Sequence, residues 1–205
     1  MIEDIVAAGK RVGKKYDAFE LDEGIKNLQT ILGEGFAPNL EAMRASDWGR
    51  VLLDPEGVAK RLISLKVCFP GLNLSRVVTR KPSLLLKSIE DIERDAGGTK
   101  KMLEKAKDLD TLIEALPDLL DPKVCLSIIL SINKWYNGRH SKVQRDPVSI
   151  LEGDPDLVYR AQAMDQPFEP VYENEDGTYQ AGEYLYRERR ADWQAYIDRT
   201  RYGQP

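Results

Sequence analysis

The chain has 205 residues, of which 42% are hydrophobic and 31% are charged, and its formal net charge is −4. That length and balance are typical of a globular protein that buries its own core. No apolar run approaches the roughly 18 residues that a membrane-spanning helix needs, and two cysteines are too few for a secreted disulfide scaffold. Both classes are therefore excluded, and we expect Cys68 and Cys125, which sit in apolar stretches, to be buried free thiols.

The first 21 residues predict an N-terminal helix. Their opening, MIEDIVAAGKR, is too acidic and too poor in Arg and Ser for a transit peptide, and it lacks the long apolar core of a secretory signal. We therefore expect no targeting segment in the chain. Removal of a transit peptide that preceded residue 1 stays open.

Charge is distributed unevenly along the chain. Residues 1–59 carry seven basic and 11 acidic side chains, residues 60–145 carry 17 and 10, and residues 146–205 carry six and 13. A basic middle between acidic ends can attract an anionic partner. The same pattern arises when a helical surface simply carries Lys and Arg on its solvent face, so both interpretations remain open.

Helix-start signals recur at a regular spacing. Asp-Pro pairs stand at 54–55 and 121–122, and Ser88 precedes an Ile-Glu-Asp sequence between them, which gives spacings of 34 and 33 residues. Asp or Ser accepts hydrogen bonds from the free N–H groups of a first helical turn, and Pro fits the first helical position. Helices are therefore predicted to begin near 55, 89 and 122, with a weaker start at Asp22.

A second set of markers keeps the same period, because segment 72–86 aligns with segment 107–120. Leu74, Val78, Pro82 and Leu85 match Leu109, Ile113, Pro117 and Leu120, and each pair is 35 residues apart. In each unit a long helix is followed by a short helix and then by an apolar turn that begins with proline. A period of about 20–50 residues is typical of a solenoid, in which stacked units bury one another's apolar faces.

We therefore predict an all-α fold: a helical-repeat solenoid of about three short repeats, with a C-terminal extension that contains a small β-hairpin and a terminal helix. The parts are an N-terminal helix at 1–21, repeats at 22–53, 54–87 and 88–120, a closing helix at 122–136 and an extension at 137–205. The first repeat is degenerate, with helices expected at about 23–32 and 40–45. Asp47 and Trp48 stand where its proline would be.

The segment FPGLNLSRVVTRKPSLLL (69–86) resembles the repeat of the mitochondrial transcription termination factor (mTERF) family, and LDTLIEALPDLL (109–120) is similar to it as well. That family repeats a helix, a short helix and a Pro-x-Leu-Leu element roughly every 30 residues. The resemblance covers about residues 22–136. It implies a curved helical solenoid that acts in mitochondria or plastids, and family members mostly bind organellar DNA or RNA along a basic concave groove. This chain departs from the family in its few repeats, its acidic net charge and its extension.

The C-terminal extension changes character from Asp146 onward. Prolines divide it into a helix expected from 155 to about 164, a hairpin over 170–182 with Asp-Gly at its turn, and a last helix over 183–201. Tyr and Trp are frequent in protein interfaces, and they gather here. The candidate partner-binding residues are Tyr172, Tyr179, Tyr184, Tyr186, Trp193 and Tyr196. Alternatively, these rings form a core stripe packed on the repeats.

Residue patterns of catalysis are missing from the sequence. His140 is the single histidine and has no cysteine or histidine cluster near it, so no metal site is expected. Asp108 and Asp110 precede or open a predicted helix, where acids complement the helix dipole rather than act as a catalytic pair. We expect no enzyme activity and no cofactor.

Two functions remain as hypotheses. The first is a scaffold or linker subunit of a large organellar assembly, such as a photosystem–antenna supercomplex or an organellar ribosome, with protein subunits as partners. It would be soluble or peripheral to a membrane complex, in a plastid rather than a mitochondrion. The second is binding of organellar RNA or DNA by the basic repeat block, since lysine and arginine contact phosphates. Its candidate residues are Arg76, Arg80, Lys81, Lys100, Lys101, Lys105 and Lys107.

Overall fold

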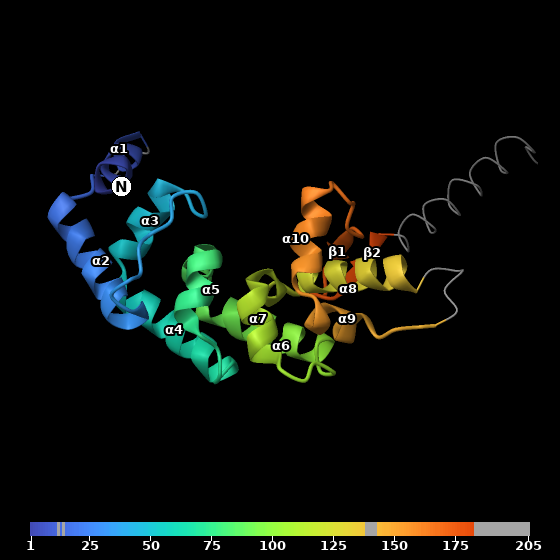
Figure 1. Ribbon diagram of the computed structural model, residues 1–205. Helices are drawn as coiled ribbons and strands as arrows, with labels where there is room; N and C mark the ends of the chain where they lie inside the picture. The colour runs from blue at the N-terminus through green and yellow to red at the C-terminus, as the bar shows by residue number, and fades with distance from the viewer. Residues whose placement is uncertain (12, 14, 138–142, 183–205) are drawn as a thin grey trace, which may run out of the picture. The chain divides into compact units, whose positions relative to one another are not determined.

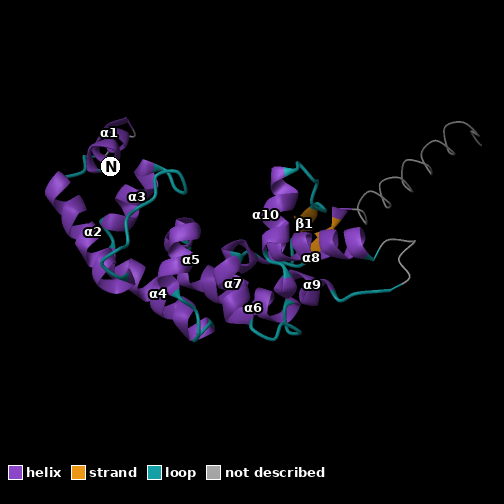
Figure 2. Cartoon of the chain, viewed as in Figure 1, coloured by secondary structure: helices purple, strands orange, loops and turns teal. Residues whose placement is uncertain are grey.

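A computed structural model describes residues 1–11, 13, 15–137 and 143–182 of the chain (Figure 1). Over these residues the chain is mostly helical, and its strands form one two-stranded antiparallel sheet (Figure 2). The expectation of a helical fold with a small hairpin is therefore confirmed.

The α-helices are α1 (Ile2–Arg11), α2 (Ala18–Leu32), α3 (Ala45–Leu52), α4 (Pro55–Cys68), α5 (Leu74–Arg80), α6 (Ile89–Met102), α7 (Leu109–Ala115), α8 (Pro122–Tyr136), α9 (Pro147–Gly153) and α10 (Asp156–Ala163). The 3₁₀ helices are η1 (Pro82–Leu86) and η2 (Pro117–Leu120), and the strands are β1 (Val171–Glu173) and β2 (Tyr179–Ala181).

These elements divide between two compact units. The first unit takes residues 1–101 and 107–120, and the second takes residues 102–106 together with the described part of 121–205. The sequence assigns α8 to the repeats as a closing helix, whereas the division of the chain groups it with the C-terminal extension. Each unit is described by itself below.

The N-terminal part of the first unit corrects the expected helix boundaries. In place of one helix over 1–21 there are α1 and the beginning of α2. The predicted start at Asp22 is wrong, because Asp17 is the residue that caps α2, accepting a hydrogen bond from the N–H of Phe19. Asp22 lies inside the helix and forms an ion pair with Lys26 at 2.7 Å, one turn further on.

The helix expected at about 40–45 is also misplaced, since α3 begins only at Ala45. Asn39 explains the difference: its side-chain oxygen accepts a hydrogen bond from the N–H of Glu41 at 2.8 Å and holds a turn there. Trp48 is buried, and its indole N–H donates to the carbonyl of Asn39 at 2.9 Å. The pair at 47–48 therefore lies within a helix, where the sequence pattern led us to expect the end of one.

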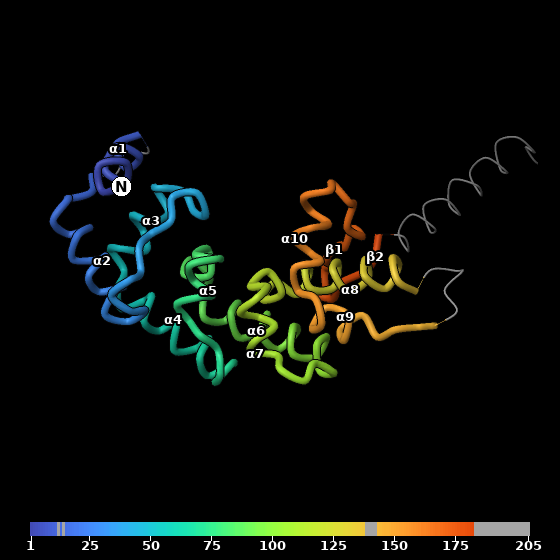
Figure 3. Tube along the Cα trace, in the orientation of Figure 1, coloured from blue at the N-terminus to red at the C-terminus, as the bar shows by residue number. Residues whose placement is uncertain are grey.

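Two segments of the first unit have the same element order (Figure 3). The order α4, α5, η1 is followed by α6, α7, η2, with the long helices offset by 34 residues and the short helices by 35. Asp54 caps α4 through the N–H of Gly57 at 3.0 Å, and Ser88 accepts a hydrogen bond from the N–H of Asp91 at 3.0 Å at the start of α6. The predicted helix starts near 55, 89 and 122 are confirmed. We name the two segments, 54–87 and 88–120, the A and B segments.

Proline ends the short helices as expected. Lys81 precedes Pro82 and has φ −134° and ψ 70°, which is outside the helical region. The apolar turns that follow are buried in both segments: Pro82, Leu84, Leu85, Pro117, Leu119 and Leu120. Burial of two leucines in one short turn fixes each 3₁₀ element on its neighbouring helices, because a turn of this length is not stable alone.

Polar side chains of the long helices bind the ends of these turns. In the A segment the guanidinium Nε of Arg61 donates to the carbonyl of Lys87 at 2.9 Å. In the B segment the fully buried hydroxyl of Thr99 donates to the carbonyl of Leu119 at 2.6 Å. Each long helix thus satisfies a backbone carbonyl at the far end of its own segment.

The second unit is built on α8. Asp121 caps this helix through the N–H groups of Lys123 and Val124. The sequence analysis did not predict α9, although Asp146 caps it by accepting a hydrogen bond from the N–H of Ser149 at 3.3 Å. The hairpin predicted over 170–182 is confirmed, with register Val171↔Ala181, Tyr172↔Gln180 and Glu173↔Tyr179. The helix predicted over 183–201 lies outside the described residues.

Candidate functional site

An acidic row lies on α7 and η2 of the B segment. Asp110, Glu114 and Asp118 are four residues apart, a spacing that places helical side chains on one face. All three contact the A segment between Gly71 and Lys81. We call these contacts the polar seam.

Two carboxylates of the polar seam bind backbone N–H groups. Asp110 Oδ2 accepts a hydrogen bond from the N–H of Gly71 at 2.7 Å, and Glu114 Oε1 accepts one from the N–H of Asn73 at 2.6 Å. Gly71 permits this approach, because a Cβ there would lie 2.3 Å from Asp110 Oδ2. Asn73 in turn caps α5 by accepting a hydrogen bond from the N–H of Arg76. The acids therefore order the turn that starts α5.

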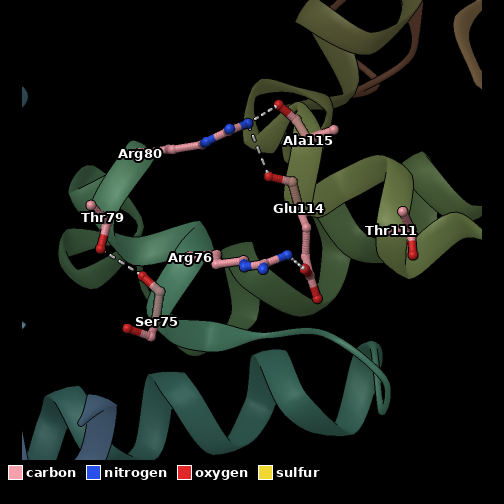
Figure 4. A pocket seen from close by; sticks show the side chains of 7 residues that line it. All are labelled: Ser75, Arg76, Thr79, Arg80, Thr111, Glu114 and Ala115. Atoms are coloured by element: carbon pink, nitrogen blue, oxygen red, sulfur yellow. Dashed lines mark hydrogen bonds and ion pairs between the residues drawn. The ribbon is translucent and has the colours of Figure 1, made fainter. Parts of the chain in front are cut away.

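The same seam engages three of the residues predicted to bind phosphate. Arg76 Nη1 lies 3.4 Å from Glu114 Oε2, and Lys81 Nζ lies 2.8 Å from Asp118 Oδ1. Arg80 donates to the carbonyl of Glu114 at 3.3 Å and to the carbonyl of Ala115, at the C-terminal end of α7, where the helix dipole favours a cation. Figure 4 shows both arginines reaching from α5 toward Glu114 and Ala115. The structure brings these cations together, but onto partners within the chain.

The four predicted lysines after α5 do not join this group. Lys100 lies over the ring of Phe69, with Nζ 5.0 Å from the centroid, a cation–π contact. Lys101, Lys105 and Lys107 are exposed. Lys105 belongs to the second unit, whereas the other three lysines belong to the first.

A groove of about 420 Å³ opens between α5 and α7 beside the polar seam (Figure 4). Its lining is Ser75, Arg76, Thr79, Arg80, Thr111, Glu114 and Ala115. Two of its hydroxyls already have partners, since Thr79 donates to the carbonyl of Ser75 at 2.7 Å and Thr111 donates to Asp108 at 2.8 Å. The N–H and hydroxyl of Thr111 hold the pKa of the Asp108 carboxyl below its ordinary value, as expected of a helix-capping acid.

A second groove, of about 440 Å³, lies in the second unit and is more apolar. We call it the hairpin groove. Its lining is Lys123, Val124, Ser127, Ile128, Gln162, Phe168, Glu169, Pro170, Val171 and Tyr172. The residues before β1 are held on α8 by a pair of hydrogen bonds: Ser127 donates to the carbonyl of Glu169 at 2.6 Å, and the N–H of Glu169 donates to Ser131 at 2.8 Å. The Glu169 carboxylate forms an ion pair with Lys134.

The tyrosines predicted to bind partners divide into two groups. Tyr172 lies on β1, is 50% exposed and lines the hairpin groove. Tyr179 lies on β2 opposite Glu173 and is half-buried. Tyr184, Tyr186, Trp193 and Tyr196 lie outside the described residues. Phe168, which the sequence analysis did not single out, packs edge-on against Trp135 with the ring centroids 5.4 Å apart and forms part of the groove wall.

Reactive and metal-binding chemistry finds little support in the part of the chain that the structure describes. Within residues 1–11, 13, 15–137 and 143–182, no three His, Cys, Asp or Glu side chains form a metal-binding group, and His140 falls outside these ranges. Cys68 is half-buried and Cys125 is buried, and neither forms a disulfide. Burial raises the pKa of the Cys125 thiol to about 12, so it is protonated at neutral pH. None of the described helices combines the length and apolar composition needed to cross a membrane.

No protein-family model matches the chain, and neither a curated protein nor a solved structure matches it. The two grooves and the polar seam are therefore the features of the chain that bear on its function. The polar seam uses its charges internally, whereas the hairpin groove presents apolar surface and a half-exposed tyrosine. Sequence reasoning did not single out the acidic row, although its acids stand at a spacing of four in the B segment, about 35 residues after the basic residues of the A segment.

Proposed function

We propose that the chain is a non-catalytic scaffold or linker subunit of a larger assembly, and that it binds partner proteins through its C-terminal extension and the surface of its helical repeats. The observation that carries this proposal is the hairpin groove, where Tyr172 leaves half of its surface exposed beside an apolar floor. A large aromatic ring at an apolar recess is a common anchor of protein interfaces.

Further exposed apolar side chains support an interaction role for the second unit. They are Tyr136, Val143, Tyr159, Met164 and Tyr172. Aromatic rings lose little conformational entropy when a partner covers them, and methionine side chains adapt easily to the shape of a partner. The first unit exposes six such side chains as well, from Met1 to Val67, so the ones that support the proposal are those that, like Tyr172, line a groove.

The organellar setting rests on the resemblance to the mTERF family. The offsets of 34 and 35 residues between the A and B segments support stacked repeats of that kind, and so a short solenoid. A plastid assembly such as a photosystem–antenna complex, or an organellar ribosome, is the setting that we infer for a chain with few repeats and an acidic extension.

Nucleic-acid binding is the second candidate, and the exposed lysines favour it. Residues 60–145 hold 17 basic and 10 acidic side chains, and Lys101, Lys105 and Lys107 are exposed. The polar seam opposes this function, because Arg76, Arg80 and Lys81 already contact oxygen atoms of the B segment. Phosphate contacts by these three residues would require breaking those interactions first.

The scaffold proposal is tested by the size of the native complex. The chain, tagged at its N-terminus, is expressed in its own cells, and extracts are fractionated by size before and after nuclease digestion. We expect it in particles far larger than its own 23.2 kDa before digestion, and after digestion too if the assembly contains no RNA. We expect Tyr172→Ala to shift part of it to the free chain. Phe19→Ala, which removes a 66% exposed ring from the first unit, is the matched control. Migration as a free chain of 23.2 kDa would refute the proposal.

The alternative is tested by fluorescence anisotropy of the full chain with single- and double-stranded RNA and DNA at two salt concentrations. A scaffold gives no saturable binding at low salt. Tight binding that weakens steeply with salt, and that weakens further in a Lys101→Ala, Lys105→Ala double variant, would establish phosphate contacts by the repeats. Glu104→Ala removes an acidic side chain between these lysines, so as a control it should strengthen such binding and not weaken it.

A further inference from the structure

Among the residues that the structure describes, the outer edge of β1 pairs with no further strand, and we call it the free edge. The N–H of Asn174 donates to the carbonyl of Thr178 at 2.8 Å, and the N–H of Gly182 donates to the carbonyl of Pro170 at 2.6 Å. In an antiparallel pair, every second residue turns its N–H and C=O toward the neighbouring strand. The backbone groups of Val171 and Glu173, between those bonded positions, therefore face away from β2.

The hairpin groove runs along this free edge. Residues 168–172 form one of its walls, and Lys123, Val124 and Ile128 of α8 line it from the helix side. β1 packs on α8, and Val171 is only 6% exposed, so the edge lies beside an apolar surface and not in open solvent. An extended segment placed here could pair with the strand and bury alternate side chains on the helix.

The charges around the edge indicate which kind of segment binds there. Residues 161–182 contain five acidic side chains and no lysine or arginine, and Lys123 of α8 is the one basic residue among those that line the hairpin groove. One of the five, Glu169, is neutralised by Lys134, whereas Glu173, Glu175 and Asp176 are exposed around the hairpin tip. Pairing of the edge with the same edge of a second copy would bring these acids together, which costs free energy. A basic partner gains from the same charges.

We propose that the free edge of β1 binds an extended segment of a partner protein as an added strand. That segment carries apolar side chains at alternate positions, which enter the hairpin groove, and lysine or arginine at the end beside the hairpin tip. This inference rests on the proposed scaffold function and deepens it by naming the class of partner segment that the extension takes.

Synthetic peptides test this proposal with the full-length chain. The probe is a fluorescent nonapeptide with lysine at both ends and in the middle and with valine and threonine alternating between them. We expect saturable binding by anisotropy. We also expect amide shifts in nuclear magnetic resonance spectra at Val124, Val171 and Glu173. A probe with N-methyl groups on alternate amides keeps its side chains but loses its strand hydrogen bonds, and should bind about tenfold more weakly. Replacing its lysines by glutamates should weaken binding by a similar factor.

Proline variants of the two strands locate the edge. Glu173→Pro removes an N–H that faces away from β2, so the hairpin keeps its own bonds while binding falls at least about tenfold. Ala181→Pro removes the corresponding outward N–H of β2 and should bind the probe as the unaltered chain does. Glu173→Gln removes the side-chain charge but keeps the backbone N–H, so it should weaken binding only about two- to threefold. Circular dichroism verifies that each variant is folded.

Each outcome has a definite meaning. No binding by the folded chain, or equal binding of the N-methylated probe, overturns strand addition. Equal losses in the two proline variants also overturn it. If the chain alone forms a dimer and Glu173→Pro abolishes that dimer, the segment that binds the edge belongs to a second copy and not to a basic partner. If the probe fails while Tyr172→Ala still releases the chain from a large particle, this inference falls and the scaffold function stands; if the chain migrates freely, both fall.

Discussion

The two units of the chain use charge in opposite ways. In the first unit the basic side chains of the A segment meet the acidic row of the B segment, so that Lys81 lies 2.8 Å from Asp118. In the second unit the acids of the hairpin tip have no basic residue near them in sequence, and the free edge of β1 lies beside them. Charges that are matched within a unit contribute to its own assembly, whereas unmatched charges are available to a partner. The second unit is therefore the one whose charges are available to a partner, although the first unit carries more of the basic residues.

The largest effects should come from the buried leucines of the first unit. Leu85 and Leu120 occupy equivalent positions and are 1% and 3% exposed. We expect Leu85→Ala and Leu120→Ala each to lower the free energy of unfolding by about 2–5 kcal/mol, because each leaves a cavity. Urea denaturation followed by circular dichroism measures this loss. Costs that differ by more than a factor of about two to three would argue against equivalent A and B segments.

The thiol of Cys125 should make the second unit sensitive to alkaline pH. Its pKa is raised from 9.0 to about 12 by burial, so the folded state keeps a proton that the unfolded state loses. Stability from this group is complete below pH 9 and falls by about 1.4 kcal/mol per pH unit as the pH rises from 9 toward 12. The pH dependence of urea denaturation should lose this component in Cys125→Ala and retain it in Cys68→Ala. In the native chain at pH 8, a thiol reagent should modify Cys68 alone; rapid reaction of both thiols would contradict the burial.

Helix caps should have effects of similar size in both units. Ser88→Ala removes the cap of α6 in the first unit, and Asp146→Ala removes that of α9 in the second. Each change should cost about 1 kcal/mol, because an N–H of the first turn loses its acceptor. Thermal denaturation measures the loss, with the exposed Ser83→Ala as control. A cost close to zero at Asp146 alone would mean that α9 contributes little to the second unit.

The smallest effect on the free energy of unfolding is expected for the ion pair between Lys81 and Asp118. A double-mutant cycle with Lys81→Ala and Asp118→Ala should give a coupling of about 0.5–1 kcal/mol at low salt and less at high salt, because both groups are partly solvated. Glu173→Gln in the second unit should leave the free energy of unfolding unchanged. If Glu173→Gln destabilises the chain as much as the loss of Lys81 does, the hairpin acids also have partners within the chain.

Local signals made much of the fold predictable. Asp54, Ser88 and Asp121 mark helix starts within one residue, because a cap and a following proline act through the nearest backbone groups. The boundaries failed where another local cap was overlooked. Asp17 caps α2 ahead of Asp22, and Asn39 holds a turn that delays α3 to Ala45.

The candidate sites were harder to predict than the fold. Tyr172 was identified by its residue type, and the structure places it at a groove. Arg76, Arg80 and Lys81 were taken for phosphate contacts, because the sequence does not show that carboxylate or carbonyl oxygens 34 to 38 residues away lie against them. The contacts between the A and B segments depend on how their short helices pack, and that is a property of tertiary structure rather than of composition.

The polar seam also has a consequence for synthesis of the chain. Lys81 leaves the ribosome 37 residues ahead of Asp118, and Arg76 leaves it 38 residues ahead of Glu114. Until the B segment follows, Arg76 and Lys81 lack the carboxylates of Glu114 and Asp118 that they contact in the folded unit. The polar seam can therefore form only after both segments have been synthesised, which makes it a late step in the assembly of this unit.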